Sequence, residues 1–200
     1  SFYRQAIPSS PNAYHLYSRH SVSNYQMDPE PGVLEIVPTS SALVALTDAT
    51  VSISNRRGLL QAHFNSLNVP ELTYGMRAMA PIDELHCNVL LGGEFSSVLN
   101  FDYSQGQVVS RMDYFMRNIT KMKSNNHSGN PTTSKLIFAS TDNGIIDIID
   151  TSSNKIVESF KAHQSSVSDF DVAGNTLVTV GKSKKFDYVS DPFVRVFDLR

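Results

Sequence analysis

Apolar residues occur along this chain in short runs, separated by clusters of Asn, Asp, Gly and Ser. Three successive examples are KLIFAS (135–140), IIDIID (145–150) and KIVESF (155–160). Runs of this kind, rich in β-branched residues and bounded by turn residues, predict β-strands. The Asn143-Gly144 pair between the first two predicts a tight hairpin in which both central residues take a positive φ. No segment keeps a helical spacing of apolar residues over twelve positions.

The same unit of four strands recurs along the sequence. First strands begin near Val33, Met76, Ile119 and Val167, at spacings of 43, 43 and 48 residues. Four strands per unit and a period of about 40–45 residues predict a β-propeller. We therefore predict an all-β fold in the form of a partial ring, with a half blade, three full blades and three strands of a fifth. The predicted blades cover residues 1–21, 33–65, 75–114, 118–160 and 166–200.

A β-sandwich of short strands is the alternative fold, and it would explain the hairpins but not the period. The longer last spacing is attributed to a loop at HSGNPTTS (127–134). Propellers close with about 4–8 blades, and closure removes exposed sheet edges. A ring that begins and ends inside blades therefore predicts that these residues belong to a longer chain.

Residues 161–200 carry a spaced set of polar and aromatic side chains. His163 precedes a predicted first strand, Thr179 lies on the second, Asp191 lies in the next turn and Phe197 lies on the third. This order resembles a WD repeat, in which such side chains form a hydrogen-bonded network across the blade. A buried carboxylate can orient a histidine and accept from the amides of the turn. The predicted propeller is accordingly of the WD type.

The WD pattern is degenerate in this chain, which contains no tryptophan. Phe197 stands where tryptophan is usual, and its ring cannot donate a hydrogen bond, so we expect a truncated network. In the preceding blade the corresponding positions hold Ala139, Asn143 and Ile149. We expect apolar packing to hold these blades together.

A closer resemblance rests on NRRG (55–58), TLVTVGKSK (176–184) and DPFVRVFDLR (191–200). Over residues 33–200 the chain resembles the N-terminal propeller of the catalytic subunit of the poly(A)-nuclease (PAN) deadenylation complex, in its budding-yeast form. The insert between the last two predicted strands is the most specific feature, because ordinary WD repeats join these strands by a short turn.

That resemblance implies an activity for the parent protein and a scaffold role for this segment. The family's catalytic subunit shortens the poly(A) tail of messenger RNA from its 3′ end. It uses a nuclease domain with two divalent metal ions (Mg²⁺) near its C-terminus, and it also contains an inactive ubiquitin-hydrolase-like domain. The resemblance implies two protein partners, a pseudokinase-like regulatory subunit and poly(A)-binding protein, and a cytoplasmic location that includes P-bodies. A generic WD-repeat adaptor of another complex is the alternative.

Candidate chemistry within the chain itself is sparse, and we expect no catalytic residue, cofactor or metal in it. The six histidines have no metal-ligand spacing, and the single cysteine, Cys87, excludes an intramolecular disulfide. Asp147 and Asp150 point to opposite faces of one predicted strand. Asp169 and Asp171 share a face near His163, and we interpret them as part of a strand-end network.

A propeller enzyme, such as a glycosidase or lactonase, would need carboxylates converging from the first strands of several blades. Those strands offer only Glu35, Asp169 and Asp171, so the sequence favours a docking function. No apolar run is long enough to cross a membrane.

Basic residues define a candidate partner or RNA surface, although the net charge of −2 does not favour bulk attraction to nucleic acid. Lysines with interleaved aromatic residues can contact phosphates and stack on bases. The alternative is that they are solvated loop charges. The candidate residues are Lys182, Lys184, Lys185, Phe186 and Tyr188 in one loop, and Arg56 and Arg57 in another.

Overall fold

The computed structural model describes residues 32–82, 87–95, 97–113, 117–125, 135–182, 191 and 193–200. Within these ranges the chain forms fifteen β-strands and no helix. In the same part of the chain there is accordingly no helix that could span a membrane. The all-β prediction is confirmed, while the half blade predicted at residues 1–21 lies outside the described residues.

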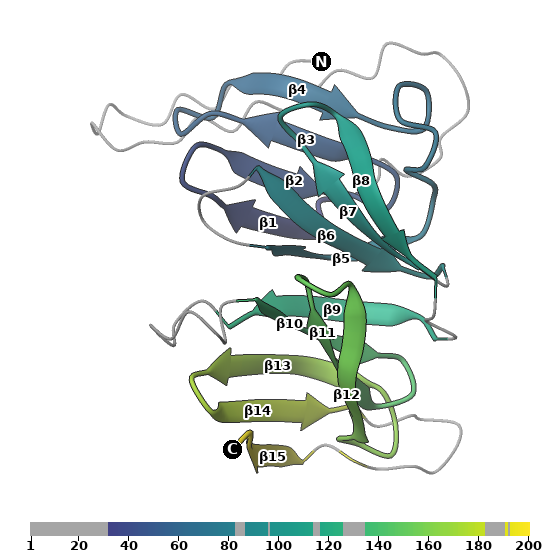
Figure 1. Ribbon diagram of the computed structural model, residues 1–200, viewed down its shortest axis with the longest axis vertical. Coiled ribbons are helices and arrows are strands. Elements are labelled where there is room, and N and C mark those ends of the chain that lie inside the picture. Colours follow the sequence, from purple (N-terminus) through teal and green to yellow (C-terminus); the bar gives the residue numbers. More distant parts are fainter. Residues whose placement is uncertain are drawn as a thin grey trace.

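The strands form four antiparallel sheets, and within each sheet they lie side by side in chain order (Figure 1). The first sheet contains β1 (Glu35–Pro38), β2 (Leu43–Leu46), β3 (Val51–Ser54) and β4 (Leu60–Phe64). The second contains β5 (Met76–Pro81), β6 (Asn88–Gly93), β7 (Val98–Asp102) and β8 (Gln107–Met112). The third contains β9 (Ile119–Ser124), β10 (Leu136–Thr141), β11 (Ile145–Asp150) and β12 (Lys155–Lys161). The fourth contains β13 (Val167–Ala173), β14 (Thr176–Gly181) and β15 (Val194–Asp198).

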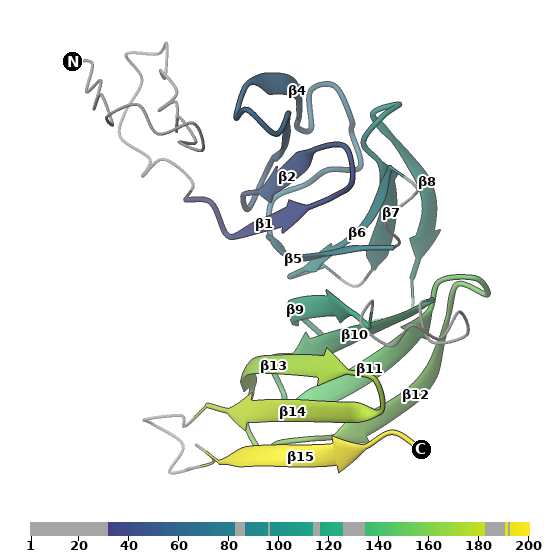
Figure 2. The ribbon, with the colours of Figure 1, turned by 90° about the vertical axis from the view of Figure 1, so that its left-hand side faces the viewer.

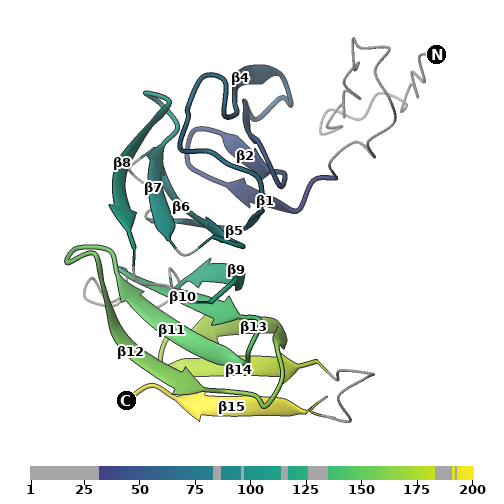
Figure 3. The ribbon, with the colours of Figure 1, turned by 90° about the vertical axis from the view of Figure 1, so that its right-hand side faces the viewer.

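The sheets follow one another as successive wedges (Figures 2 and 3). The first strands pack against one another between sheets: β1 contacts β5, β5 contacts β9, and β9 contacts β13. The strands β8 and β12 lie on the side away from that row (Figure 2). Sheets related in this way are the blades of a propeller, and the partial ring predicted from the sequence is confirmed.

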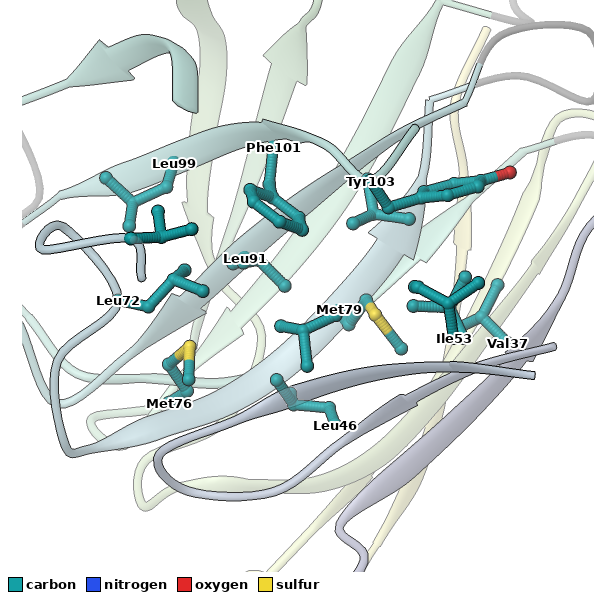
Figure 4. Packing of buried hydrophobic residues seen from close by; sticks show 14 of the residues in the cluster. Val37, Leu46, Ile53, Leu72, Met76, Met79, Leu91, Leu99, Phe101 and Tyr103 are labelled. Atoms are coloured by element: carbon teal, nitrogen blue, oxygen red, sulfur yellow. The ribbon is translucent and has the colours of Figure 1, made fainter. Parts of the chain in front are cut away.

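Apolar side chains fill the space between each pair of neighbouring sheets. The first cluster joins the first and second sheets, and Figure 4 shows Leu46 on one side of it with Leu91 and Phe101 on the other. A second cluster joins the second and third sheets, and a third joins the third and fourth. Each fully buried Leu, Ile or Phe contributes about 1.5–3 kcal/mol relative to exposure. The blades are therefore held together by packing, as expected.

The turn between β10 and β11 differs from the predicted hairpin. Only Gly144 has a positive φ, of +81°, and Asn143 does not. The N–H of Gly144 donates to the carbonyl oxygen of Thr141 at 3.1 Å. The prediction of two positive φ angles is wrong because the loop has one more residue than a two-residue turn, and only its last residue needs the left-handed conformation. The backbone also passes very close to this glycine, since an added Cβ would lie 2.2 Å from the carbonyl oxygen of His163.

Candidate functional site

A buried polar network ties together the fourth sheet and the connection that precedes it. His163 comes from that connection, Thr179 from β14 and Asp191 from the loop before β15, and all three are buried. The Nε2 atom of His163 and the hydroxyl of Thr179 form a hydrogen bond of 2.9 Å. The Nδ1 atom of the ring lies 3.2 Å from Oδ2 of Asp191, although it is not aligned as a regular hydrogen bond. The structure thus brings together the three polar residues that the WD pattern singled out.

Asp191 accepts hydrogen bonds from both sides of this network. The backbone N–H of Gln164 donates to Oδ2 at 2.6 Å, and Nη2 of Arg195 donates to Oδ1 at 3.2 Å. The Gln164 bond is the main reason that the pKa of Asp191 lies below its ordinary value, and His163 and Arg195 lower it further against the opposing effect of burial. The carboxylate is therefore ionised throughout the neutral range.

Arg195 completes the network, although the sequence pattern did not indicate it. Besides binding Asp191, its Nη1 donates to the carbonyl oxygen of Ala162 at 2.9 Å. Phe197 packs its ring on Phe160, with the ring centroids 5.1 Å apart. The aromatic position therefore contributes packing and no hydrogen bond, as expected, and the arginine adds donors to Asp191 and to the carbonyl oxygen of Ala162.

The third sheet has no equivalent of this network at the positions that the sequence comparison aligned. Ala139 and Ile149 are buried in the second apolar cluster. The side-chain oxygen of Asn143 accepts a hydrogen bond of 2.7 Å from the hydroxyl of Thr141. That bond stabilises the turn between β10 and β11 locally and does not extend across the sheet.

A different buried carboxylate, Asp147, lies on β11 of the third sheet. Its side chain is 2% exposed, receives a hydrogen bond from the hydroxyl of Ser159 and lies 3.5 Å from Nη1 of Arg117. Asp150 has other partners, since it accepts from the hydroxyl and the N–H of Ser152, and these bonds lower its pKa. The two carboxylates do not form a shared acid and base pair.

Ion pairs between the first strands of neighbouring blades form a second candidate site, the inner-strand row. Nζ of Lys121 lies 2.8 Å from Oδ1 of Asp169, and Nζ of Lys123 lies 3.1 Å from Oδ1 of Asp171. Partial burial is the largest single effect on Asp169 and raises its pKa, but the bonds from Lys121 and from the N–H of Phe170, together with the charges of Lys121 and Lys123, outweigh burial and lower the pKa overall. Both aspartates are exposed and bind β9. These ion pairs fit the structural role that we interpreted for the two aspartates, but the network lies between the first strands of two blades and not at a strand end near His163.

Glu35 joins the inner-strand row from the first sheet. Its Oε2 accepts a hydrogen bond of 2.8 Å from the backbone N–H of Met79 on β5. Burial raises the pKa of Glu35, while the bond from Met79 and the charges of Lys121 and Lys123 act in the opposite direction. Glu35 therefore connects the first two blades by a hydrogen bond, but its ionised carboxylate loses part of its hydration on burial.

Replacing Glu35 by alanine is expected to lower the free energy of unfolding by about 2 kcal/mol, because the buried N–H of Met79 loses its acceptor. Glu35→Gln keeps an acceptor oxygen and is expected to stay near wild type at pH 4. Because burial raises the pKa of Glu35, the linked stability is complete below the unfolded value of about 4.3 and is lost as pH rises through the folded value, so wild type is expected to become less stable than Glu35→Gln at pH 8. Chemical denaturation followed by circular dichroism between pH 4 and pH 8 measures both effects. Equal stability of Glu35→Ala and wild type would contradict this assignment.

The predicted basic surface is only partly within the described residues. Lys182 is exposed, and its backbone N–H bonds the carbonyl oxygen of Ser166 at 2.9 Å. Arg56 donates to the carbonyl oxygen of Ser40 at 2.7 Å, whereas the exposed Arg57 forms no ion pair with the described part of the chain. The remaining candidates, Lys184, Lys185, Phe186 and Tyr188, lie outside the described residues.

The described residues do not fit a magnesium site. A two-metal nuclease needs several carboxylates that converge on the ions. Within residues 32–82 and the other described ranges, no group of three His, Cys, Asp or Glu side chains lies close enough to hold a metal ion. Asp169 and Asp171 each bind a lysine, and Asp191 binds its buried partners. These carboxylates serve the structure of the propeller.

The wedge-like sheets and the network of the fourth blade define the chain as a WD-repeat β-propeller. Among solved structures it is similar to the WD40 domain of Neurospora crassa Pan2, at 21% identity and a TM-score of 0.67, over 84% of this chain and 48% of that one. It is also similar to the WD40 repeats of RRP9, at 15% identity and a TM-score of 0.64, over 78% of this chain and 46% of that one.

Sequence comparison is more specific. The model of the PAN2 N-terminal family matches residues 22–200, so the chain belongs to that family. It is 31% identical to the PAN2-PAN3 deadenylation complex catalytic subunit PAN2 of Kluyveromyces lactis, over 97% of this chain and 16% of the relative. The subunit of the same name from Saccharomyces cerevisiae is 30% identical, over 84% of this chain and 14% of the relative. The chain thus spans about a sixth of the length of these curated relatives.

Proposed function

We propose that this propeller is the docking part of the catalytic subunit of a PAN2-PAN3 deadenylation complex. The main support for the proposal is the family match over residues 22–200. In this region the aspartates of the inner strand β13 form ion pairs with the lysines of β9, so these charged side chains serve the fold. The propeller holds the regulatory subunit and the poly(A) ribonucleoprotein, and the shortening of the poly(A) tail takes place elsewhere in the parent protein. There, a separate nuclease domain binds Mg²⁺ and cleaves the RNA.

The relatives support this division of labour. Their names describe a catalytic subunit within a complex of two kinds of subunit, and this chain covers 16% of the Kluyveromyces lactis protein. A propeller presents many loops on a rigid ring, and function in such folds lies in the loops and not in the sheets. A rigid docking domain raises the effective concentration of the nuclease at its substrate.

Co-purification tests the proposal with the full-length parent protein and a variant that lacks residues 22–200. Both are mixed with the regulatory subunit, and with poly(A) covered by poly(A)-binding protein. We expect the variant to recover less of both partners. Undiminished recovery of both would contradict a docking role.

A further inference from the structure

The turn between β10 and β11 contains the one Asn-Gly dipeptide of the chain, Asn143-Gly144. An asparagine side chain lies close to the backbone nitrogen of the next residue, and a glycine at that position has no Cβ to shield the nitrogen. Attack of this nitrogen on the side-chain amide leads to deamidation of the asparagine. Asn143 is exposed, so water reaches its amide, whereas Gly144 is buried. The turn therefore brings together the groups that this reaction needs.

The reaction has two steps, and water is its only co-reactant. In the first step, the N–H of Gly144 loses its proton to hydroxide, and the nitrogen forms a bond to Cγ of Asn143. The Cγ–Nδ2 bond breaks, ammonia leaves, and a cyclic imide remains. In the second step, water adds to one carbonyl of the ring and breaks its bond to the nitrogen. One ring opening gives aspartate, and the other gives isoaspartate, whose backbone is one carbon longer. No group is oxidised or reduced.

Hydrogen bonds hold the peptide unit between Asn143 and Gly144 in place. Its N–H donates to the carbonyl oxygen of Thr141 at 3.1 Å, and its carbonyl oxygen accepts from Nζ of Lys161 at 2.5 Å. The hydroxyl of Thr141 also donates to Oδ1 of Asn143 at 2.7 Å. Formation of the imide requires this peptide unit to rotate and to lose its N–H proton, so these bonds must break first. The reaction therefore depends on a local opening of the turn.

Gly144 also anchors the connection between the third and fourth blades. Its carbonyl oxygen accepts from the N–H groups of Ala162 and His163, both at 2.9 Å. The two segments lie so close together that a Cβ on Gly144 would be 2.0 Å from the carbonyl oxygen of Ser165. A backbone that is one carbon longer at position 143 displaces Gly144 and breaks this arrangement. His163 belongs to the buried network of the fourth blade, so the effect extends to that blade.

We propose that Asn143 is a deamidation site that the closed turn protects, and that isoaspartate at this position releases the connection that carries His163. The deamidated fraction then records how often the turn between β10 and β11 opens. Aspartate, the other product, keeps the length of the backbone, and the ammonium of Lys161 already binds the same residue. The aspartate product therefore leaves the connection in place.

Peptide mapping by mass spectrometry tests the protection. Deamidation of Asn143 is followed at pH 8 in the full-length parent protein and in a synthetic peptide of residues 136–150. We expect the folded protein to react at least about tenfold more slowly, because only its open fraction reacts. Thr141→Val removes the hydroxyl that holds the turn and is expected to react about fivefold faster than wild type. Thr141→Ser keeps a hydroxyl and is the matched control, expected to react within about twofold of wild type.

Hydrogen exchange tests the consequence for the connection. The parent protein is incubated at pH 9 until peptide mapping detects isoaspartate. We then expect a fraction of equal size to exchange rapidly at the N–H groups of Ala162 and His163. Asn143→Gln is the control, because its longer side chain forms the corresponding ring far more slowly, and it is expected to keep slow exchange through the same incubation.

Each contrary result overturns a definite part of the proposal. Equal rates in the folded protein and the peptide would overturn the protection by the turn. The absence of deamidation even in the peptide would show that Asn143 is not a reactive site. Slow exchange at Ala162 and His163 in molecules that contain isoaspartate would overturn the release of the connection.

Discussion

Asp191→Ala is expected to lower the free energy of unfolding of the propeller by about 3 kcal/mol. The change removes a buried carboxylate that receives the N–H of Gln164 at 2.6 Å and lies beside His163 and Arg195. These groups would remain in place without their common partner, and a buried polar group that loses its partner keeps its full cost of desolvation. Chemical denaturation of the wild-type and variant propellers measures the difference.

Asp191→Asn is the matched control, because it keeps the size of the side chain and one acceptor oxygen. We expect it to lose less stability than Asp191→Ala at pH 7. The folded pKa of Asp191 is depressed, so its contribution is present above the unfolded value of about 3.9 and is lost as pH falls through the folded value. Wild type should therefore lose its advantage over Asp191→Asn at acid pH. Identical stabilities of wild type and Asp191→Ala at pH 7 would contradict the claim that this buried network stabilises the fold.

Phe101→Ala is expected to lower the free energy of unfolding by about 4 kcal/mol. Phe101 is completely buried in the cluster between the first two blades, and its ring meets the ring of Phe64 edge-on at 5.2 Å. Removal of the ring leaves a cavity between sheets that rigid neighbouring strands cannot close. Thermal and chemical denaturation measure the loss.

Val109→Ala is the control for that change, since Val109 is an exposed residue of β8 in the same blade. We expect its effect to stay within about 0.5 kcal/mol. A small effect of Phe101→Ala, similar to that of the control, would show that packing between blades contributes less to the free energy of unfolding than the complete burial of Phe101 indicates.

The sequence predicted the features that repeat or lie close together along the chain. The period placed the first strands at Met76, Ile119 and Val167, where β5, β9 and β13 begin. Within the last blade, the resemblance to a WD repeat singled out His163 and Asp191, whose side chains the fold brings within 3.2 Å of each other. A sequence pattern can indicate such contacts because neighbouring strands of one sheet follow each other in the chain.

Contacts between blades could not be predicted in this way. Lys123 and Asp171 are far apart in sequence, and their pairing depends on how two sheets pack. Arg195 was missed for a related reason, although one signal was available. Arg195 and Phe197 are two residues apart on β15, so their side chains lie on the same face of the sheet. A cation on the face that packs against the blade needs an anionic partner such as Asp191. The sequence also could not tell which leucine of the connection between the first two blades is exposed. Leu72 is buried in the core, whereas Leu67 is exposed to solvent.

The rate of poly(A) shortening on two substrates tests the central claim most directly. Full-length parent protein, with and without residues 22–200, is assayed with the regulatory subunit on naked poly(A) and on poly(A) covered by poly(A)-binding protein. We expect the shortened protein to keep its rate on naked poly(A) within about twofold, and to lose about tenfold on the covered tail as the effective concentration falls. An equal loss on both substrates would contradict the claim that this propeller docks the substrate complex and leaves the chemistry to the rest of the protein.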